Sequence, residues 1–496
     1  MAPTPEAPIA STTGGRLRGR LVRTGGAAGI LTFRGIPFAA APVGPLRFQP
    51  PAPPEPWTGV RDAIEFGPTA PQDSSGTEVA KILPNVIIPG DDCLSLNVWT
   101  QSLEGARPVM VFIHGGAFST GSGAVSIYDG TRFARDGVVL VTLNYRLGAD
   151  GFLWFGEGVP NLGMLDQVAA LEWVRDNIAA FGGDPGNVTV FGESAGAMSI
   201  CTLMVMPRAR GLFHRAIAES GAGESVISPE SALLVGNRLA AILGVEASRE
   251  GIASVPLEKL LAAATQLGGE VGAKPRRALW GDVAHNLMAF EPIVDGDILP
   301  GIPRDLIAAG AARDIELLIG TNTDEAQLFF VPTGAMQKMS WIVAYVFANI
   351  YTGHPVRTVR RIRRQNPDAT PGERAAAVLT EGFYRRPALA IADAHPGTFV
   401  YEFAWRSGAF AGLLGACHAL ELPFVFDAIG DPTTQELLGR DAPQATADAM
   451  HAAWVAFART GDPGWPAYAP GNRASMRFDT VSELTTDDLT APPSGR

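Results

Sequence analysis

Short apolar runs separated by amphipathic stretches dominate the pattern of this chain. The runs have the near-continuous apolar character of parallel strands that are covered on both faces, and they lie at 109–113, 138–141, 188–191 and 317–319. Between the second and third runs, apolar residues recur at spacings of three and four, which predicts a helix at 165–178 that ends before Gly182-Gly183. Repetition of strand, helix and strand predicts an α/β fold with a mostly parallel, doubly wound sheet.

The first hundred residues follow a different pattern. Residues 16–22 alternate between polar and apolar side chains, and turns rich in proline and glycine follow, which predicts antiparallel strands at the edge of the sheet. Residues 256–365 mix short helices with loops, and we expect them to form an insertion or lid of regulatory type over the sheet. Without internal repeats or low-complexity tracts, we expect one domain over residues 1–496.

The overall charge excludes one class of partner. The formal net charge is -11, so a surface for nucleic-acid phosphates is not expected, although arginines cluster at 360–364 and 385–386. Such short runs are typical of solvated helix faces. The longest apolar stretch, at 341–350, is shorter than the roughly 20 residues that span a bilayer, so we expect no membrane span.

Cysteine usage and the N-terminal residues bear on location. Three cysteines, Cys93, Cys201 and Cys417, cannot form an even disulfide framework, and their spacing resembles no zinc site. The first residues lack the basic start and apolar run of a secretory signal. We therefore expect a cytoplasmic protein, a monomer or small homo-oligomer, without a metal.

A nucleophile motif follows the third apolar run. Gly192-Glu193-Ser194-Ala195-Gly196 stands between a predicted strand and a predicted helix, which is the context of a nucleophile elbow. Small residues are needed on both sides because bulkier ones would clash with the neighbouring strand and helix. The motif predicts Ser194 as a nucleophile, against the alternative of a structural turn.

A second glycine motif follows the first apolar run. In His114-Gly115-Gly116-Ala117-Phe118, backbone amides can point at a developing oxyanion. We predict Gly116 and Ala117 as donors, supported by Gly115, with the amide of Ala195 as the third donor. A plain turn is the alternative, whereas a phosphate loop is excluded because no Walker motif occurs.

A serine nucleophile needs a histidine as base and a carboxylate that orients the histidine. On this fold the acid comes after the serine in the sequence, and the histidine comes after the acid. His418 lies in a loop after a predicted strand at 398–405, where the fold presents its base, whereas His354 and His395 precede prolines in turn-like surroundings. Asp324 and Glu325 both follow the strand at 317–319. The pattern does not separate these two acids.

Together these residues resemble the type-B carboxylesterase and lipase family, in the pattern of its bacterial para-nitrobenzyl esterase-like members. The resemblance covers nearly the whole chain, and it rests on the segments 33–39, 45–48, 91–98, 144–148, 161–167 and 181–185. It implies the α/β-hydrolase fold and hydrolysis of carboxylic esters.

The resemblance also implies roles for single residues. Glu325 matches the family's acid, although Ala326 replaces the usual glycine, and His418 matches the family's base, although Ala419 replaces a glycine. Ser220 resembles a residue that supports the triad. Two structural ion pairs are implied, Arg47 with Asp91 and Arg146 with Asp166.

Two departures from the family pattern narrow the expectation. Ala70 replaces the cysteine that often bridges to the position of Cys93, so no disulfide is expected there. Residues 73–90 contain no aromatic side chain that could hold a quaternary ammonium group, so we expect no choline site.

We therefore predict a serine carboxylesterase that acts on small-molecule esters through an acyl-enzyme and needs no cofactor. An amidase, a carbamate hydrolase or an esterase for toxins or plasticisers on the same triad is the first alternative. A non-catalytic, neuroligin-like binding protein is the second. Aromatic and apolar side chains that could line the acyl pocket are Phe118, Leu328, Phe329, Phe330, Trp341 and Phe347.

Overall fold

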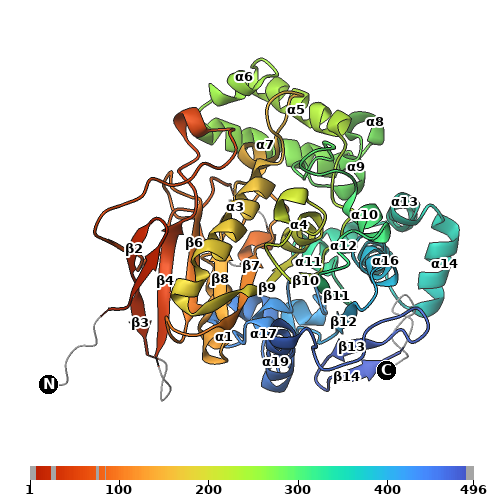
Figure 1. Cartoon of the computed structure of the whole chain (residues 1–496). Coiled ribbons are helices and arrows are strands. Elements are labelled where there is room, and N and C mark those ends of the chain that lie inside the picture. The colour runs from red at the N-terminus through yellow and green to blue at the C-terminus, as the bar shows by residue number, and fades with distance from the viewer. Residues whose placement is uncertain (1–6, 24–28, 74–77, 84, 487–496) are drawn as a thin grey trace.

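A sheet of eleven strands forms the centre of the computed structural model, which describes residues 7–23, 29–73, 78–83 and 85–486 (Figure 1). Its order is β14-β13-β12-β11-β10-β9-β7-β8-β6-β4-β3. The strands of this sheet are β3 (Arg20–Val22), β4 (Ile30–Pro37), β6 (Ser95–Thr100), β7 (Arg107–Ile113), β8 (Val139–Leu143), β9 (Gly183–Glu193), β10 (Arg215–Glu219), β11 (Glu316–Asn322), β12 (Phe399–Phe403), β13 (Ser475–Phe478) and β14 (Glu483–Thr485).

The four predicted apolar runs are the middle strands of this sheet. β7 pairs in parallel with β8 and β9, and β9, β10, β11, β12 and β13 continue in parallel. Their side chains are buried on both faces, as the absence of polar alternation predicts. The predicted fold class, a mostly parallel sheet with antiparallel N-terminal strands, is therefore confirmed.

The N-terminal strands divide between two sheets. β1 (Ile9–Thr12), β2 (Gly15–Arg18) and β5 (Val60–Asp62) form a small separate sheet, whereas β3 and β4 pair antiparallel at the edge of the large one. The alternating segment 16–22 is thus not one strand. It is interrupted at Gly19, where a Cβ would lie 2.6 Å from the carbonyl oxygen of Thr32.

Helices cover both faces of the sheet (Figure 1). The predicted helix at 165–178 is α3, which begins three residues earlier. The helices are α1 (Thr131–Arg135), α2 (Gly148–Phe152), α3 (Leu162–Asn177), α4 (Ala195–Leu203), α5 (Pro229–Leu243), α6 (Arg249–Ala253), α7 (Leu257–Ala273), α8 (Arg277–Trp280), α9 (Val283–Asn286), α10 (Pro303–Ala308), α11 (Gln327–Phe330), α12 (Ala335–Lys338), α13 (Trp341–Thr352), α14 (Pro355–Gln365), α15 (Pro371–Leu379), α16 (Arg386–Ala394), α17 (Leu422–Val425), α18 (Gln435–Leu438) and α19 (Gln444–Thr460).

Residues 256–365, predicted as an insertion, include a strand of the central sheet. β11 lies between β10 and β12, so the helices of this range form two groups, one before β11 and one after it. In Figure 1, α7, α8 and α9 of the first group lie in the upper part of the view, and α13 and α14 of the second lie at the right edge. A lid role for either group stays a prediction.

Of the two ion pairs implied by the resemblance, one is present. Arg146 and Asp166 are fully buried and form a bidentate pair, with Nε to Oδ2 at 2.8 Å and Nη2 to Oδ1 at 2.7 Å. The pairing of Arg47 with Asp91 was wrong. α2 brings Asp150 beside Arg47, whose Nε lies 3.0 Å from Asp150 Oδ1, whereas Asp91 is exposed.

All three cysteines are free and buried. Burial raises the pKa of the Cys93 and Cys201 thiols to about 12 in each case. Burial also raises the pKa of the Cys417 thiol well above its ordinary value. Because the thiolate is the reactive form of cysteine, these three side chains are chemically inert at neutral pH.

Candidate active site

Ser194 lies at a sharp turn between β9 and α4, as the elbow motif predicts. Its φ of 56° and ψ of −123° are unfavourable for a residue with a side chain, so the surrounding structure must hold it in place. A Cβ on Gly192 would lie 2.4 Å from the carbonyl oxygen of Ile113, and one on Gly196 would lie 2.0 Å from the same atom. The two glycines are therefore required by the close approach of β7.

The predicted oxyanion loop lies directly against this serine. A Cβ on Gly115 would lie 3.0 Å from the Cβ of Ser194, so only glycine fits there. Gly116 and Ala117 both have positive φ, and no backbone partner is recorded for either amide among the described residues. Ala195 begins α4, where the first amides of a helix have no partner within the helix. All three predicted donors are thus free to bind an anion.

His418 lies beside the elbow and contacts two glutamates. Its Nδ1 is 2.7 Å from Oε2 of Glu325, which is fully buried, and its main-chain amide donates to the carbonyl oxygen of Glu325 at 3.2 Å. Its Nε2 is 3.0 Å from Oε1 of Glu193, although these two atoms are not aligned as a hydrogen bond. Ser194 Oγ has no hydrogen-bond partner among the described residues.

The two neighbouring acids that the sequence left open point in different directions. Oε1 of Glu325 accepts from the amide of Asn322 at 2.8 Å, which leaves Oε2 for His418. Asp324 instead accepts from Arg406 Nη1 at 2.5 Å and from the amide of Ala416 at 3.0 Å. Asp324 therefore holds the loop that carries His418, and of these two acids Glu325 is the one that contacts the ring.

The two alanines that replace family glycines differ in their backbone conformation. Ala326 has a φ of −68°, which any residue adopts, so the substitution leaves the Glu325 loop unstrained. Ala419 has a φ of 63°, in the left-handed region that favours glycine. The loop of the histidine is therefore the strained one.

Two buried glutamates near His418 were not predicted from the sequence. Glu193 belongs to the elbow motif itself, and Glu421 follows His418 by three residues. Glu421 accepts hydrogen bonds from Ser220 Oγ at 3.4 Å and from Asn322 Nδ2. The predicted supporting residue Ser220 therefore contacts Glu421 rather than the triad. Two signals in the sequence could have identified these glutamates. Glu193 is a charged residue at the end of an apolar strand, and Glu421 is a charged residue within Leu-Glu-Leu-Pro.

The two glutamates that contact His418, Glu193 and Glu325, change its pKa. Burial by itself would lower the pKa of His418, but Glu193 and Glu325 outweigh it, so the pKa lies well above its ordinary value. Burial raises the pKa of Glu193, and His418 opposes the rise. Burial also raises the pKa of Glu421 to about 8, with the charges of Glu193 and Glu325 adding to the rise. The surroundings of Glu421 therefore favour its protonated, neutral form.

Two aromatic rings pack against the ring of His418. The ring centroids of Phe329 and Tyr384 lie 5.4 Å and 4.9 Å from that of His418. Tyr384 belongs to a π-helical turn, Thr380–Arg385, that joins α15 to α16, and such turns often occur at functional sites. Of the other side chains predicted for the acyl pocket, Phe118 and Leu328 are fully buried and Trp341 is exposed.

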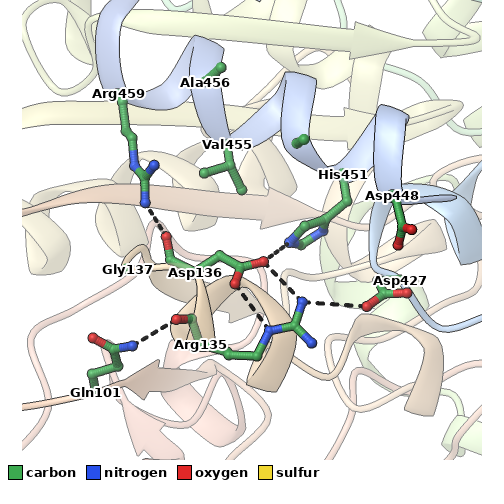
Figure 2. Close-up of a pocket in the computed structure, with 11 residues that line it drawn as sticks. Gln101, Arg135, Asp136, Gly137, Asp427, Asp448, His451, Val455, Ala456 and Arg459 are labelled. Atoms are coloured by element: carbon green, nitrogen blue, oxygen red, sulfur yellow. Dashed lines mark hydrogen bonds and ion pairs between the residues drawn. The ribbon is translucent and has the colours of Figure 1, made fainter. Parts of the chain in front are cut away.

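A large cavity lies elsewhere in the molecule. It has a volume of about 620 Å³ and lies between α1 and α19 (Figure 2). The cavity is at the amino end of β8, whereas Ser194 follows the carboxyl end of the parallel strand β9. Its charged side chains contact one another. Arg135 is bidentate to Asp136, and His451 Nε2 lies 3.2 Å from Asp136 Oδ2. None of the predicted site residues lines this cavity, so it is not the candidate active site.

Comparison with known proteins identifies the family of this chain. A model of the carboxylesterase family matches residues 6–489. The chain belongs to the carboxylesterase family. It is 39% identical to the para-nitrobenzyl esterase of Bacillus subtilis over 93% of both chains, and 35% identical to the phenmedipham hydrolase of Pseudarthrobacter oxydans over 98% of both. A crystal structure of a Geobacillus stearothermophilus carboxylesterase superposes with a TM-score of 0.83, at 39% identity, and the match covers 96% of this chain and 97% of the other.

Membership of the carboxylesterase family makes this protein a carboxylic ester hydrolase. The resemblance read from the sequence motifs is confirmed. No helix in the described part of this carboxylesterase is long and apolar enough to cross a membrane.

Proposed function

We propose that this enzyme hydrolyses small carboxylic esters by two-step acyl transfer, with Ser194 as nucleophile, His418 as general base and Glu325 as the acid that orients the histidine. The contact of His418 Nδ1 with Glu325 Oε2 at 2.7 Å is the observation that carries the proposal. In the neutral ring this contact favours the proton on Nδ1, so that the lone pair of Nε2 can accept the proton of a serine hydroxyl.

In the first step Ser194 Oγ attacks the ester carbonyl carbon as Nε2 of His418 takes its proton. The oxyanion accepts hydrogen bonds from the amides of Gly116, Ala117 and Ala195. The imidazolium then gives its proton to the leaving alcohol, and an acyl-enzyme remains. In the second step water attacks this acyl group, His418 takes the proton of the water and returns it to Oγ, and the acid leaves.

One rearrangement precedes the chemistry. Nε2 of His418 lies 3.0 Å from Oε1 of Glu193, so the ring must exchange this contact for one with Ser194 Oγ before it can take the proton of the serine. The raised pKa of His418 favours the protonated ring in the resting enzyme. Activity should therefore increase as the pH rises through that pKa.

The proposal is tested with para-nitrobenzyl and para-nitrophenyl esters, the latter from acetate to decanoate. Ser194→Ala should lower kcat roughly 10⁵- to 10⁶-fold if the triad acts as a unit. Ser199→Ala is the matched control on the same helix. Among the described residues, Ser199 Oγ has one hydrogen-bond partner, Gln167 Nε2, from which it accepts at 3.1 Å, and this variant should stay near wild type. A fluorophosphonate should add covalently to the wild-type peptide that contains Ser194. Unchanged turnover in Ser194→Ala would refute the assignment.

A further inference from the structure

One face of α13 is apolar and exposed to solvent. Its exposed fractions are 45% for Trp341, 71% for Ile342, 39% for Tyr345 and 46% for Val346, and these positions lie on one side of the helix. Ala344 and Ala348, beside this stripe, are buried against α14 and α15 and anchor the helix. Exposed aromatic and aliphatic side chains gathered on one helix face are typical of a binding surface.

The helix that follows is strongly basic. α14 contains five arginines and no acidic residue, and it packs beside α13 at one edge of the molecule (Figure 1). Arg357, Arg360, Arg363 and Arg364 have no ion-pair or hydrogen-bond partner among the described residues. Only Arg361 is paired, with Glu381. Four guanidinium groups are thus available to an external anion.

This concentration of positive charge contrasts with the rest of the protein. The chain has a formal net charge of -11, yet residues 326–367 contain five arginines, Lys338 and no aspartate or glutamate. We propose that α13 and α14 form a docking face for an anionic lipid surface, with the apolar stripe of α13 inserted among the acyl chains and the arginines of α14 on the headgroups. Indole and phenol rings such as those of Trp341 and Tyr345 favour this boundary, and cationic side chains bind anionic lipid there.

A second copy of the chain fits this face less well. A two-fold contact brings the same surface of both copies together, so the unpaired arginines of α14 would face each other without acidic partners. An anionic lipid layer instead offers acyl chains to the apolar stripe and negative headgroups to the arginines. α13 has 12 residues, which is too short to span a bilayer, so the helix would lie in the plane of the surface.

The docking face lies next to the candidate active site. Phe347 of α13 stacks on Phe330 of α11 with ring centroids 6.2 Å apart, and the adjacent Phe329 contacts the ring of His418. Docking would therefore bring esters dissolved in the lipid close to the triad. Only this consequence rests on the proposed function, because lipid binding itself requires no catalytic residue.

The test is flotation of the full-length protein with vesicles of phosphatidylcholine alone and of phosphatidylcholine mixed with phosphatidylglycerol. We expect partitioning onto the anionic vesicles only, decreasing as salt is added. Each arginine near the surface contributes about 5-fold to partitioning, so Arg360→Gln combined with Arg363→Gln should weaken it roughly 25-fold. Ile342→Ser should also weaken it, by removing the most exposed side chain of the stripe.

Matched controls use exposed side chains away from this face. Arg208→Gln with Arg210→Gln, and separately Val481→Ser, should leave partitioning unchanged, since Val481 is 75% exposed and both arginines are exposed. Circular dichroism verifies that every variant folds.

Equal binding to neutral vesicles, no binding to either kind, or equal loss in the control variants would overturn the proposal. Self-association in sedimentation velocity that Ile342→Ser abolishes, without vesicle binding, would assign the face to a second copy instead. Ser194→Ala should bind vesicles like wild type, which separates this result from failure of the proposed mechanism.

Discussion

Replacing Glu325 by glutamine should disable the histidine without changing the shape of the site. Oε1 of Glu325 accepts from the amide of Asn322, which can only donate, so the carbonyl oxygen of a glutamine must occupy that position. Its NH₂ group then faces Nδ1 of His418, where the carboxylate oxygen was 2.7 Å away. Nδ1 must now accept, so the ring carries its proton on Nε2 and cannot take one from Ser194.

The magnitude follows from the loss of the correct tautomer. In a triad of this kind the acid-to-amide change costs about 10⁴-fold in kcat, which corresponds to about 5.4 kcal/mol of transition-state stabilisation. Glu325→Asp keeps a carboxylate facing the ring at a longer reach, so its loss should be much smaller. Asp324→Asn is the matched control. Asp324 contacts Arg406 and the amide of Ala416 rather than the ring, and its loss should stay within about 10-fold.

The assay is kcat/KM for a para-nitrophenyl ester, with Ser194→Ala as the floor and thermal denaturation as the check on folding. Activity of Glu325→Gln within about 10-fold of wild type would refute the assignment of the acid. An equal loss in Asp324→Asn would show that loop position, not the tautomer, controls the rate.

Three further predictions concern charge and backbone strain. Asp166→Asn leaves a buried guanidinium without its anionic partner, so urea denaturation should show a loss of about 3–5 kcal/mol in unfolding free energy, and a loss below about 1 kcal/mol would contradict this. Ala419→Gly should raise the unfolding free energy by up to about 1 kcal/mol, because glycine adopts a φ of 63° without strain. Ala326→Gly should lower the unfolding free energy, because alanine is unstrained at a φ of −68°. Effects of the same sign in the two variants would contradict the strain argument. Glu193→Gln removes one of the two carboxylates that raise the pKa of His418, so the acidic limb of the kcat/KM profile should move to lower pH, and an unmoved limb would exclude this electrostatic role.

The central sheet could be predicted because its strands are buried on both faces and therefore read as uninterrupted apolar runs. The sharp turn at Ser194 and the glycine loop beside it could be predicted because Gly115, Gly192 and Gly196 have no room for a Cβ. Where two backbone segments approach closely, only glycine fits, and the resulting glycines can be recognised in a single sequence. The division of residues 16–22 between two sheets could not be predicted, because it depends on contact with β4 rather than on the local pattern.

The choice between Asp324 and Glu325 also depended on distant residues. Both acids follow β11, and their directions are set by Arg406 and Ala416 on one side and His418 on the other, which lie about eighty to ninety residues further along the chain. The contact of Glu193 with His418 arises in the same way from segments far apart in sequence. The pairing of Arg47 was wrong for a similar reason, because α2 supplies a nearer carboxylate.

The burial of Cys93, Cys201 and Cys417 has a practical consequence. Maleimides and similar reagents couple to thiolates, and the raised pKa of each native thiol keeps it protonated and out of reach of solvent. The natural protein therefore serves as an unreactive background for single-site labelling. A polarity-sensitive fluorophore attached through Ile342→Cys would report directly on the environment of α13, without prior removal of any native cysteine.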